Sequence, residues 1–297
     1  MLAYLQAERH KRSHGRDLGC ASHLKPYFRG KDMTQLRAAD IRGYIEHRRD
    51  TVAPATINRE LCLLSAAINY ARREWEWDIP NPVSGRKLKE PEGRVRWITR
   101  GDAEALIRGI KKSQSYLVDF IRLALHTGCR KQELLGLEWS RVDLKENLFL
   151  LEAAHTKTAR RRSIPLNTAA RAAILNRARF RSEHCPASPW VFAHKDGTRI
   201  LDLKNSFASA CKNAGIKDFR IHDLRHTCAA WLVSRGVPLS EVKELLGHST
   251  INMTERYAHL APENVRAAVA VLDGESRFSH GAQKDDATPV EGTSPSA

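Results

Sequence analysis

Apolar residues recur at helical spacing through the first third of the chain. Between Thr56 and Arg73 they return every three or four positions, which predicts a long amphipathic helix, and the stretch from Leu36 to Arg48 predicts another. Thr56 is expected to cap the start of the longer helix. A polar, proline-containing and basic run follows and interrupts the pattern. We therefore predict an all-helical first domain over residues 1–90 and a linker over residues 91–96.

The pattern changes after the linker, where helices alternate with short strands. Thr99 is expected to cap a first helix, the dense apolar residues from Tyr116 to Thr127 predict a core helix, and a helix after Gly128 carries Glu133 and Trp139. Three short strands are predicted at Val142–Leu144, Leu148–Leu151 and Ser163–Leu166. Further helices are predicted at Thr168–Arg181, Leu203–Ala214, Asp223–Arg235, Leu239–Leu246 and Thr250–Leu260.

These elements predict a mainly α fold with one small antiparallel β-sheet, an α+β architecture whose second domain covers residues 97–273. A short apolar helix is expected at Ala261–Leu272. The final residues, 274–297, are rich in Ser, Pro, Gly, Thr and Asp, and this composition predicts a disordered tail.

The charge of the chain indicates a polyanionic partner. Its 297 residues hold 49 Lys and Arg against 34 Asp and Glu, a formal net charge of +15, and both predicted domains are basic. Such surfaces bind nucleic acid because neutralised phosphates release condensed counterions. No stretch reaches the roughly 18 apolar residues of a membrane span, and the six cysteines form no CxxC pair. We therefore expect a cytoplasmic protein with reduced thiols and no membrane partner.

Residues suited to phosphate chemistry occur at separate places in the second domain. Planar guanidinium groups match the negative charge that gathers on a phosphodiester under attack. Arg130 follows Thr127 and Gly128, whose tight turn is expected to direct it to a helix start, where anions are favoured. His222 lies three residues before Arg225, so both side chains reach one helical face.

A histidine and a tyrosine follow further along the chain. His248 comes after Gly247, a predicted helix end, and its side chain is expected to point out of a turn. Tyr257 comes nine residues after His248. A free phenol has a pKa of about 10, so nearby cations must favour the phenolate or a histidine must accept its proton before it attacks.

Three other residues have simpler interpretations from the sequence alone. Lys157 lies among basic residues between two predicted strands, where a solvated turn is the default. Glu133 is expected to orient an arginine or another polar group. His226 directly follows Arg225, so it is expected to point to another face and to act as a structural histidine.

In this order and spacing the residues resemble the tyrosine recombinases, the phage-integrase family. The resemblance rests on the runs TGCRKQEL (127–134), TKT (156–158), HDLRH (222–226), LGH (246–248) and ERY (255–257). It implies paired catalytic arginines, a lysine general acid, two active-site histidines and a tyrosine nucleophile, which match in turn Arg130 and Arg225, Lys157, His222 and His248, and Tyr257.

The resemblance also implies an activity and partners. The first domain would be a core-binding domain and the second a catalytic domain, together forming a clamp around double-stranded DNA. The tyrosine would attack the scissile phosphate and leave a 3′-phosphotyrosine and a free 5′-hydroxyl, so rejoining would need no ATP. Arginines would stabilise the charge, so no metal or other cofactor is expected.

Strand exchange would require a tetramer of this chain on DNA and a Holliday-junction intermediate. The apolar helix over 261–272 is the expected contact with a neighbouring protomer, and an accessory DNA-bending protein is a further expected partner. The stretch before Leu36 is too short for a separate arm-binding domain beside the helical one, which favours a simple recombination site or the integrase of a compact mobile element.

Two other interpretations start from the same residues. His222 and His226 have the i, i+4 spacing of zinc ligands, with His248 as a third ligand. That hypothesis leaves the basic charge and Arg130 unexplained, and Arg225 would repel the metal. The second alternative is a catalytically inactive DNA-binding protein of the same fold, which the presence of every expected catalytic residue disfavours.

Overall fold

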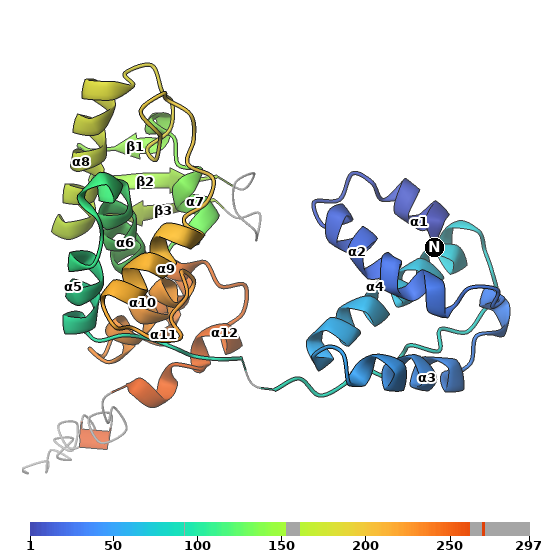
Figure 1. The fold of residues 1–297 in the computed structure, drawn as a ribbon. Helices are drawn as coiled ribbons and strands as arrows, with labels where there is room; N and C mark the ends of the chain where they lie inside the picture. The colour runs from blue at the N-terminus through green and yellow to red at the C-terminus, as the bar shows by residue number, and fades with distance from the viewer. Residues whose placement is uncertain (92, 153–160, 262–268, 271–297) are drawn as a thin grey trace, which may run out of the picture. The chain divides into compact units, whose positions relative to one another are not determined.

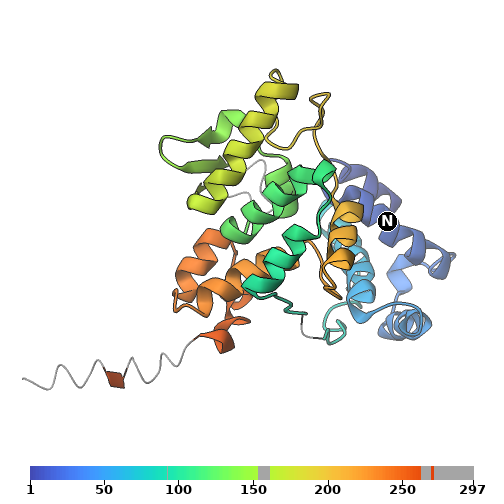
Figure 2. The same ribbon diagram turned by 60° about the vertical axis from the view of Figure 1, so that its left-hand side comes forward.

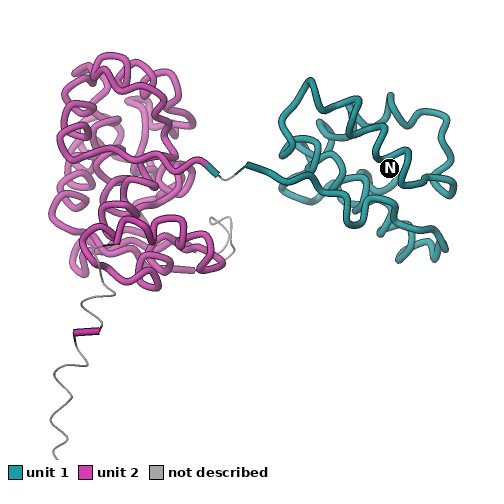
Figure 3. Tube along the Cα trace, turned by 90° about the horizontal axis from the view of Figure 1, so that it is seen from below, with its two compact units in different colours: residues 1–93 teal, residues 94–297 magenta. Residues whose placement is uncertain are grey.

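The computed structural model describes residues 1–91, 93–152, 161–261 and 269–270 (Figure 1). The chain divides into two compact units, Met1–Gly93 and Arg94–Ala297, coloured separately in Figure 3. Lys157, most of the segment 261–272 and the tail 274–297 lie outside the described residues. Within the described ranges, no helix combines the length and the apolar character needed to cross a bilayer.

Unit 1 is helical wherever it has regular structure among its described residues. Its elements are α1 (Leu2–Ala7), α2 (His14–Tyr27), the 3-10 turn η1 (Met33–Gln35), α3 (Ala38–Arg49) and α4 (Pro54–Glu74). Helices α3 and α4 confirm the two predicted helices. The expected cap at Thr56 was wrong, because α4 begins earlier: Ala53 is the N-cap and Pro54 occupies the first turn, where its missing N–H costs no hydrogen bond.

Unit 2 holds more helices and one small sheet (Figure 1). Its helices are α5 (Arg100–Arg108), α6 (Ser115–Thr127), α7 (Lys131–Leu135), α8 (Thr168–His184), α9 (Lys204–Asn213), α10 (Asp223–Val233), α11 (Leu239–Leu246) and α12 (Asn252–Glu255). Its 3-10 turns are η2 (Lys112–Gln114), η3 (Trp139–Arg141) and η5 (Ala258–Leu260). Its strands are β1 (Val142–Asp143), β2 (Leu148–Leu151) and β3 (Arg162–Pro165).

The three strands form one antiparallel sheet in the order β1-β2-β3. Phe149 of β2 pairs with Ile164 of β3, and both are fully buried in one cluster with Phe120 of α6 and Ile174 of α8. Helices α6 and α8 pack together alongside this sheet (Figure 2). The mainly α fold with a small antiparallel sheet is therefore confirmed, and its core anchors the end of α6, where the first site residues follow.

Two predicted helices of unit 2 are shorter or broken. Helix α7 ends at Leu135, so Trp139 lies in a separate 3-10 turn. The single helix predicted over 250–260 was wrong, because α12 ends at Glu255 and η5 begins only at Ala258. Tyr257 lies between them and packs inward on the apolar cluster of α10 and α11. The burial of this one side chain accompanies the break in the helix.

The predicted N-cap of α5 and the predicted end of α6 are both observed. Thr99 caps α5 as expected: its hydroxyl oxygen accepts from the Asp102 backbone N–H, and Asp102 accepts from the Thr99 N–H in return. Gly128 ends α6 in the left-handed conformation with φ +63°. A Cβ at Gly128 would collide with the side chain of Leu246, so α11 closes tightly over this turn.

We expect Gly128→Ala to lower the free energy of unfolding by about 2–4 kcal/mol, because it adds left-handed strain and overpacks the contact with Leu246. Gly101→Ala is the matched control, since Gly101 lies in α5 and its added Cβ would meet only the Thr99 hydroxyl at 3.8 Å. The control should be neutral or stabilising by up to about 1 kcal/mol. Denaturant unfolding measures both, and equal effects would contradict the assigned constraint.

Candidate active site

Arg130 is fixed at the start of α7 by a carboxylate one turn later. Arg130 is the N-cap residue, and its backbone N–H donates to Glu133 Oε2 at 2.8 Å. Its Nη1 donates to Glu133 Oε1 at 2.8 Å, and its Nη2 donates to the Gly247 carbonyl at 3.3 Å. The expectation that Glu133 orients an arginine is confirmed. Arg130 is therefore held from both sides while its guanidinium still lines a cavity.

Arg225 lies one turn into α10 and is almost fully buried, with 4% of its surface exposed. Its Nη1 donates to the Gly128 carbonyl at 2.7 Å, whereas Nη2 has no hydrogen-bond partner among the described residues. Burial, followed by repulsion from Arg130, lowers the pKa of Arg225 to about 10, so the group is still cationic at neutral pH. A buried cation with an unused donor favours an anionic ligand that accepts this hydrogen bond.

His248 follows the left-handed C-cap Gly247 that ends α11. The residue is 7% exposed, and its Nδ1 shares a hydrogen bond of 2.8 Å with Thr254 Oγ1, which fixes the ring. Burial, then the charges of Arg225 and Arg130, lower the pKa of His248 to about 3. The imidazole is therefore neutral at physiological pH and can donate or accept a hydrogen bond in the cavity.

Tyr257 is 1% exposed and packs between α10 and α11 with Ala229 and Val242. Its hydroxyl shares a short hydrogen bond with Nδ1 of His226. Burial raises the pKa of Tyr257 to about 12, although Arg256 and Arg225 act in the opposite direction. In this structure the phenol is therefore neutral, and its hydroxyl is aimed at an imidazole.

The expectation that His226 lies apart from the site was wrong. Its ring lies 5.0 Å from the ring of His222, one helical turn earlier, and its Nδ1 contacts the Tyr257 hydroxyl. Burial, then repulsion from His222, lowers the pKa of His226 to about 4, so this imidazole is neutral at physiological pH. The i, i+4 spacing of the two histidines was the signal for a shared face, but from the sequence that spacing was interpreted only as a zinc motif.

Five of the six predicted site residues line one cavity of about 380 Å³. Its lining residues are Arg130, His222, Arg225, His226, His248, Ser249, Met253, Arg256 and Tyr257. Lys157, the sixth, lies outside the described residues. The segments that meet here are far apart in the sequence: the turn after α6, the start of α10, the end of α11 and the break after α12.

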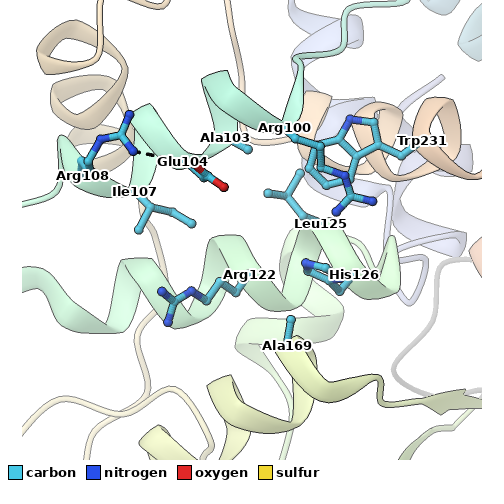
Figure 4. Close-up of a pocket in the computed structure, with 10 residues that line it drawn as sticks. All are labelled: Arg100, Ala103, Glu104, Ile107, Arg108, Arg122, Leu125, His126, Ala169 and Trp231. Carbon is cyan, nitrogen blue, oxygen red and sulfur yellow. Dashed lines mark ion pairs between the residues drawn. The ribbon is translucent and has the colours of Figure 1, made fainter.

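Another cavity, of about 400 Å³, lies between α5 and α6 (Figure 4). The guanidinium of Arg100 stacks over the ring of Trp231 at 3.6 Å from its centre, while Arg122 and His126 extend from α6. None of the predicted site residues lines it. Among the described residues, the predicted groups for phosphate chemistry therefore lie in the first cavity and not in this one.

The zinc hypothesis has no geometric support in the described residues. Among them, no three His, Cys, Asp or Glu side chains are grouped so that they could hold a metal ion. Nδ1 of His226 instead contacts Tyr257, and Nδ1 of His248 contacts Thr254.

Comparison with known proteins places these residues in a family. Residues 96–264, more than half of the chain, match the model of the phage integrase family. The chain belongs to the phage integrase family. The cavity described above lies entirely inside the matched range, so the residues that the sequence singled out form part of the family's shared domain.

Individual relatives of this phage integrase family member include a phage integrase and a shufflon-specific DNA recombinase of Escherichia coli, the latter 29% identical over 262 residues, which cover 84% of this chain and 65% of that protein. The integrase of Salmonella phage P22 is 32% identical over 235 residues, which cover 74% of this chain and 58% of that protein. The chain thus spans somewhat more than half the length of that relative.

Solved structures support the fold. The Tn1549 transposon integrase in complex with a circular intermediate DNA aligns with a TM-score of 0.72 at 21% identity, covering 91% of this chain and 98% of that one. A lambda integrase tetramer bound to a Holliday junction aligns with a TM-score of 0.70 at 18% identity, covering 86% and 75%. At these identities the likeness establishes a shared fold.

The lowered pKa of His226 makes stability depend on pH. Unfolding returns its pKa from about 4 toward 6.5, so between these values the unfolded chain binds more protons than the folded chain. Stability should therefore be complete above pH 6.5 and decline as the pH falls toward 4, and His248, with a pKa of about 3, adds to the same trend. We expect His226→Asn, which keeps a polar atom near Tyr257, to flatten this decline.

Thermal unfolding measured in steps from pH 7 to pH 4 checks this expectation. His194→Asn serves as the control, because His194 is exposed in a loop of the same unit. The control should keep the slope of the original chain. A His226→Asn variant with an undiminished slope would show that the buried imidazole is not the source of the pH dependence.

Proposed function

We propose that this chain is a site-specific DNA recombinase that cleaves and rejoins double-stranded DNA through a phosphotyrosine intermediate. The observation that carries the proposal is one cavity lined by Tyr257, whose hydroxyl contacts His226, together with Arg130 and Arg225. A nucleophile, a proton acceptor and paired cations are the groups that phosphoryl transfer requires. Family membership supports the same assignment.

The bonds change in one transesterification. The Tyr257 oxygen attacks the scissile phosphorus, the bond from phosphorus to the 5′-oxygen breaks, and the product is a 3′-phosphotyrosine. His226 takes the phenol proton, because its neutral Nδ1 is already hydrogen-bonded to that hydroxyl. The departing 5′-oxygen needs a proton, and we assign its delivery to Lys157 on the strength of the family motif. Reversal by another 5′-hydroxyl rejoins the strand and conserves the ester energy, so no ATP is needed.

The two arginines would bind the non-bridging oxygens of the phosphate. The unused Nη2 donor of Arg225 supports a direct contact with one oxygen. The hydrogen bond from Arg130 to Glu133 holds the Arg130 guanidinium in one orientation, which supports a contact with the other oxygen. Neutral His248, and His222 at the start of α10, would complete the hydrogen bonds to the phosphate. This set stabilises the developing charge without requiring a metal or other cofactor.

The proposed partners are double-stranded DNA and further copies of this chain. The net charge of +15 supports binding to a polyanion. A tetramer on a Holliday junction follows by analogy with the lambda integrase assembly, whose catalytic fold this chain shares. An accessory DNA-bending protein is a further proposed partner, and we propose the cytoplasm as the place where the chain meets its DNA.

Tyr257→Phe should abolish covalent adducts with a nicked suicide substrate while DNA binding remains nearly unchanged, because only the attacking oxygen is lost. Gel separation of adducts and a binding titration measure the two properties. Tyr116→Phe is the matched control, since Tyr116 is a half-buried residue near the start of α6, away from the cavity.

Each reaction should be run with and without excess EDTA, always without nucleotide. Adduct formation by Tyr257→Phe would refute the assigned nucleophile. Loss of activity in EDTA, together with stoichiometric zinc in the protein, would instead favour the metalloprotein. Tight binding by the original chain with no adduct would favour the inactive DNA-binding alternative.

Arg225→Gln should slow cleavage by about 100-fold or more, because one transition-state donor is removed. Its affinity for DNA should fall much less, since many other cations contact the backbone. Single-turnover cleavage and a binding titration separate the two, and Arg171→Gln, a change on the exposed face of α8, controls for the loss of one charge. Equal losses in binding and cleavage would make Arg225 an ordinary phosphate contact.

A further inference from the structure

Arg162, the first residue of β3, extends from the sheet toward Glu133. Together with Arg130 and Arg225 it forms a buried group of positive charges around Glu133, called the cationic centre of unit 2 below. Nη2 of Arg162 donates to Glu133 Oε2 at 2.8 Å, and the two side chains are only 11% and 2% exposed. Glu133 is the same carboxylate that orients Arg130. One buried carboxylate thus joins two arginines that are 32 residues apart in the sequence.

The three donors to Glu133 divide its oxygens unequally. Oε1 accepts from Nη1 of Arg130, whereas Oε2 accepts from the Arg130 backbone N–H and from Nη2 of Arg162. Burial alone would favour the protonated acid, but the charges of Arg162 and Arg130 prevail and hold the pKa of Glu133 below its ordinary value. Arg162 therefore acts together with Arg130 on both the rotation of this carboxylate and its charge.

Arg162 also contacts the other partner of Arg130. A Cβ added at Gly247 would collide with the Arg162 guanidinium, which therefore lies directly against the Gly247 backbone. The Gly247 carbonyl accepts from Nη2 of Arg130, and the next residue is His248. Arg162 thus contacts both groups that hold Arg130, the Glu133 carboxylate and the Gly247 backbone. The second of these directly precedes His248, a proposed active-site residue.

Stability alone is a poor explanation for this arrangement. A guanidinium in this position loses its hydration, and its Nε is buried without a hydrogen-bond partner among the described residues. Such desolvation offsets much of the gain from an ion pair, so apolar side chains of similar size are often at least as stabilising. A buried, partly unsatisfied cation is better explained by a geometric role.

We propose that Arg162 is a positioning residue for the cleavage step, acting through Glu133 and Gly247 on Arg130 and His248. This inference rests on the proposed recombinase function. With Arg162 in place, the Glu133 carboxylate keeps one oxygen directed at the Arg130 fork, and the turn at Gly247 keeps its carbonyl on the other side. Without Arg162, the Glu133 carboxylate can rotate and the Arg130 guanidinium can turn with it. The N–H groups of Arg130 then no longer match the oxygens of the phosphate.

The test compares Arg162→Gln with Arg161→Gln. Arg161 is the adjacent residue, exposed and outside the cavity, so both variants lose one charge from the same segment. With enzyme saturating a nicked DNA substrate, we expect Arg162→Gln to slow adduct formation by about 10- to 100-fold, by analogy with the loss of groups that orient metal ligands. DNA affinity should match that of the Arg161→Gln control.

A double-mutant cycle with Glu133→Gln distinguishes positioning from a general loss of charge. If Arg162 acts through Glu133, Arg162→Gln should slow cleavage much less in the Glu133→Gln background than alone. Arg162→Lys, which restores the charge but offers a single point of contact, should have an intermediate rate. This variant decides the question if Arg162→Gln fails to fold.

The outcomes separate this inference from the proposed function. If the original chain forms adducts and Arg162→Gln forms them at the rate of Arg161→Gln, only the role of Arg162 is refuted. Full additivity in the double-mutant cycle, or a loss of affinity as large as the loss of rate, would also refute it. If the original chain forms no adduct, the proposed function itself fails.

Discussion

One buried carboxylate, that of Glu133, makes the cationic centre of unit 2 possible. Arg130, Arg162 and Arg225 all contribute positive charge there, and each loses hydration on burial. Without a counter-charge, this concentration of like charge in a medium of low dielectric would oppose folding. Glu133 offsets part of it and uses its two oxygens to set the direction of two guanidinium groups. The same interaction that permits burial therefore defines the geometry available to an anionic ligand.

Burial has the opposite consequence for Tyr257, the proposed nucleophile. The environment of Tyr257 raises its pKa to about 12, and burial is the largest cause. The neighbouring arginines alone therefore do not ionise the phenol in this arrangement. Contact of the ring with water would remove the main contribution to its high pKa. His226, neutral and in contact with the hydroxyl, is the proposed acceptor of the phenol proton.

Much of this fold could be predicted from the sequence, because its signals are local. The spacing of apolar residues located α6 and α8, and alternation with turn residues located the strands. Site residues with a motif of their own, such as Arg130 and Tyr257, were also named in advance. What the sequence did not show were contacts made across the fold. The partnership of Arg162 with Glu133 and the contact of His226 with the tyrosine depend on side chains that only tertiary packing brings together.

The helix predicted over 250–260 illustrates the same limit. Its local pattern was compatible with a continuous helix, yet the chain breaks around Tyr257, whose large side chain is buried among residues of α10 and α11. Tertiary packing overrode local propensity at the residue proposed to do the chemistry. Such conflicts between local and global preference are expected where function constrains the structure.

The backbone conformation at Gly247 limits which residues this position can hold. Any side chain at this position meets two independent obstacles, a left-handed backbone at φ +64° and the guanidinium of Arg162. The guanidinium can give way because it is the end of a flexible side chain, but the left-handed backbone still disfavours any residue other than glycine. A lineage that has adopted this turn must therefore keep the glycine whatever residue stands at position 162, and a change of the glycine would require a new course of the turn.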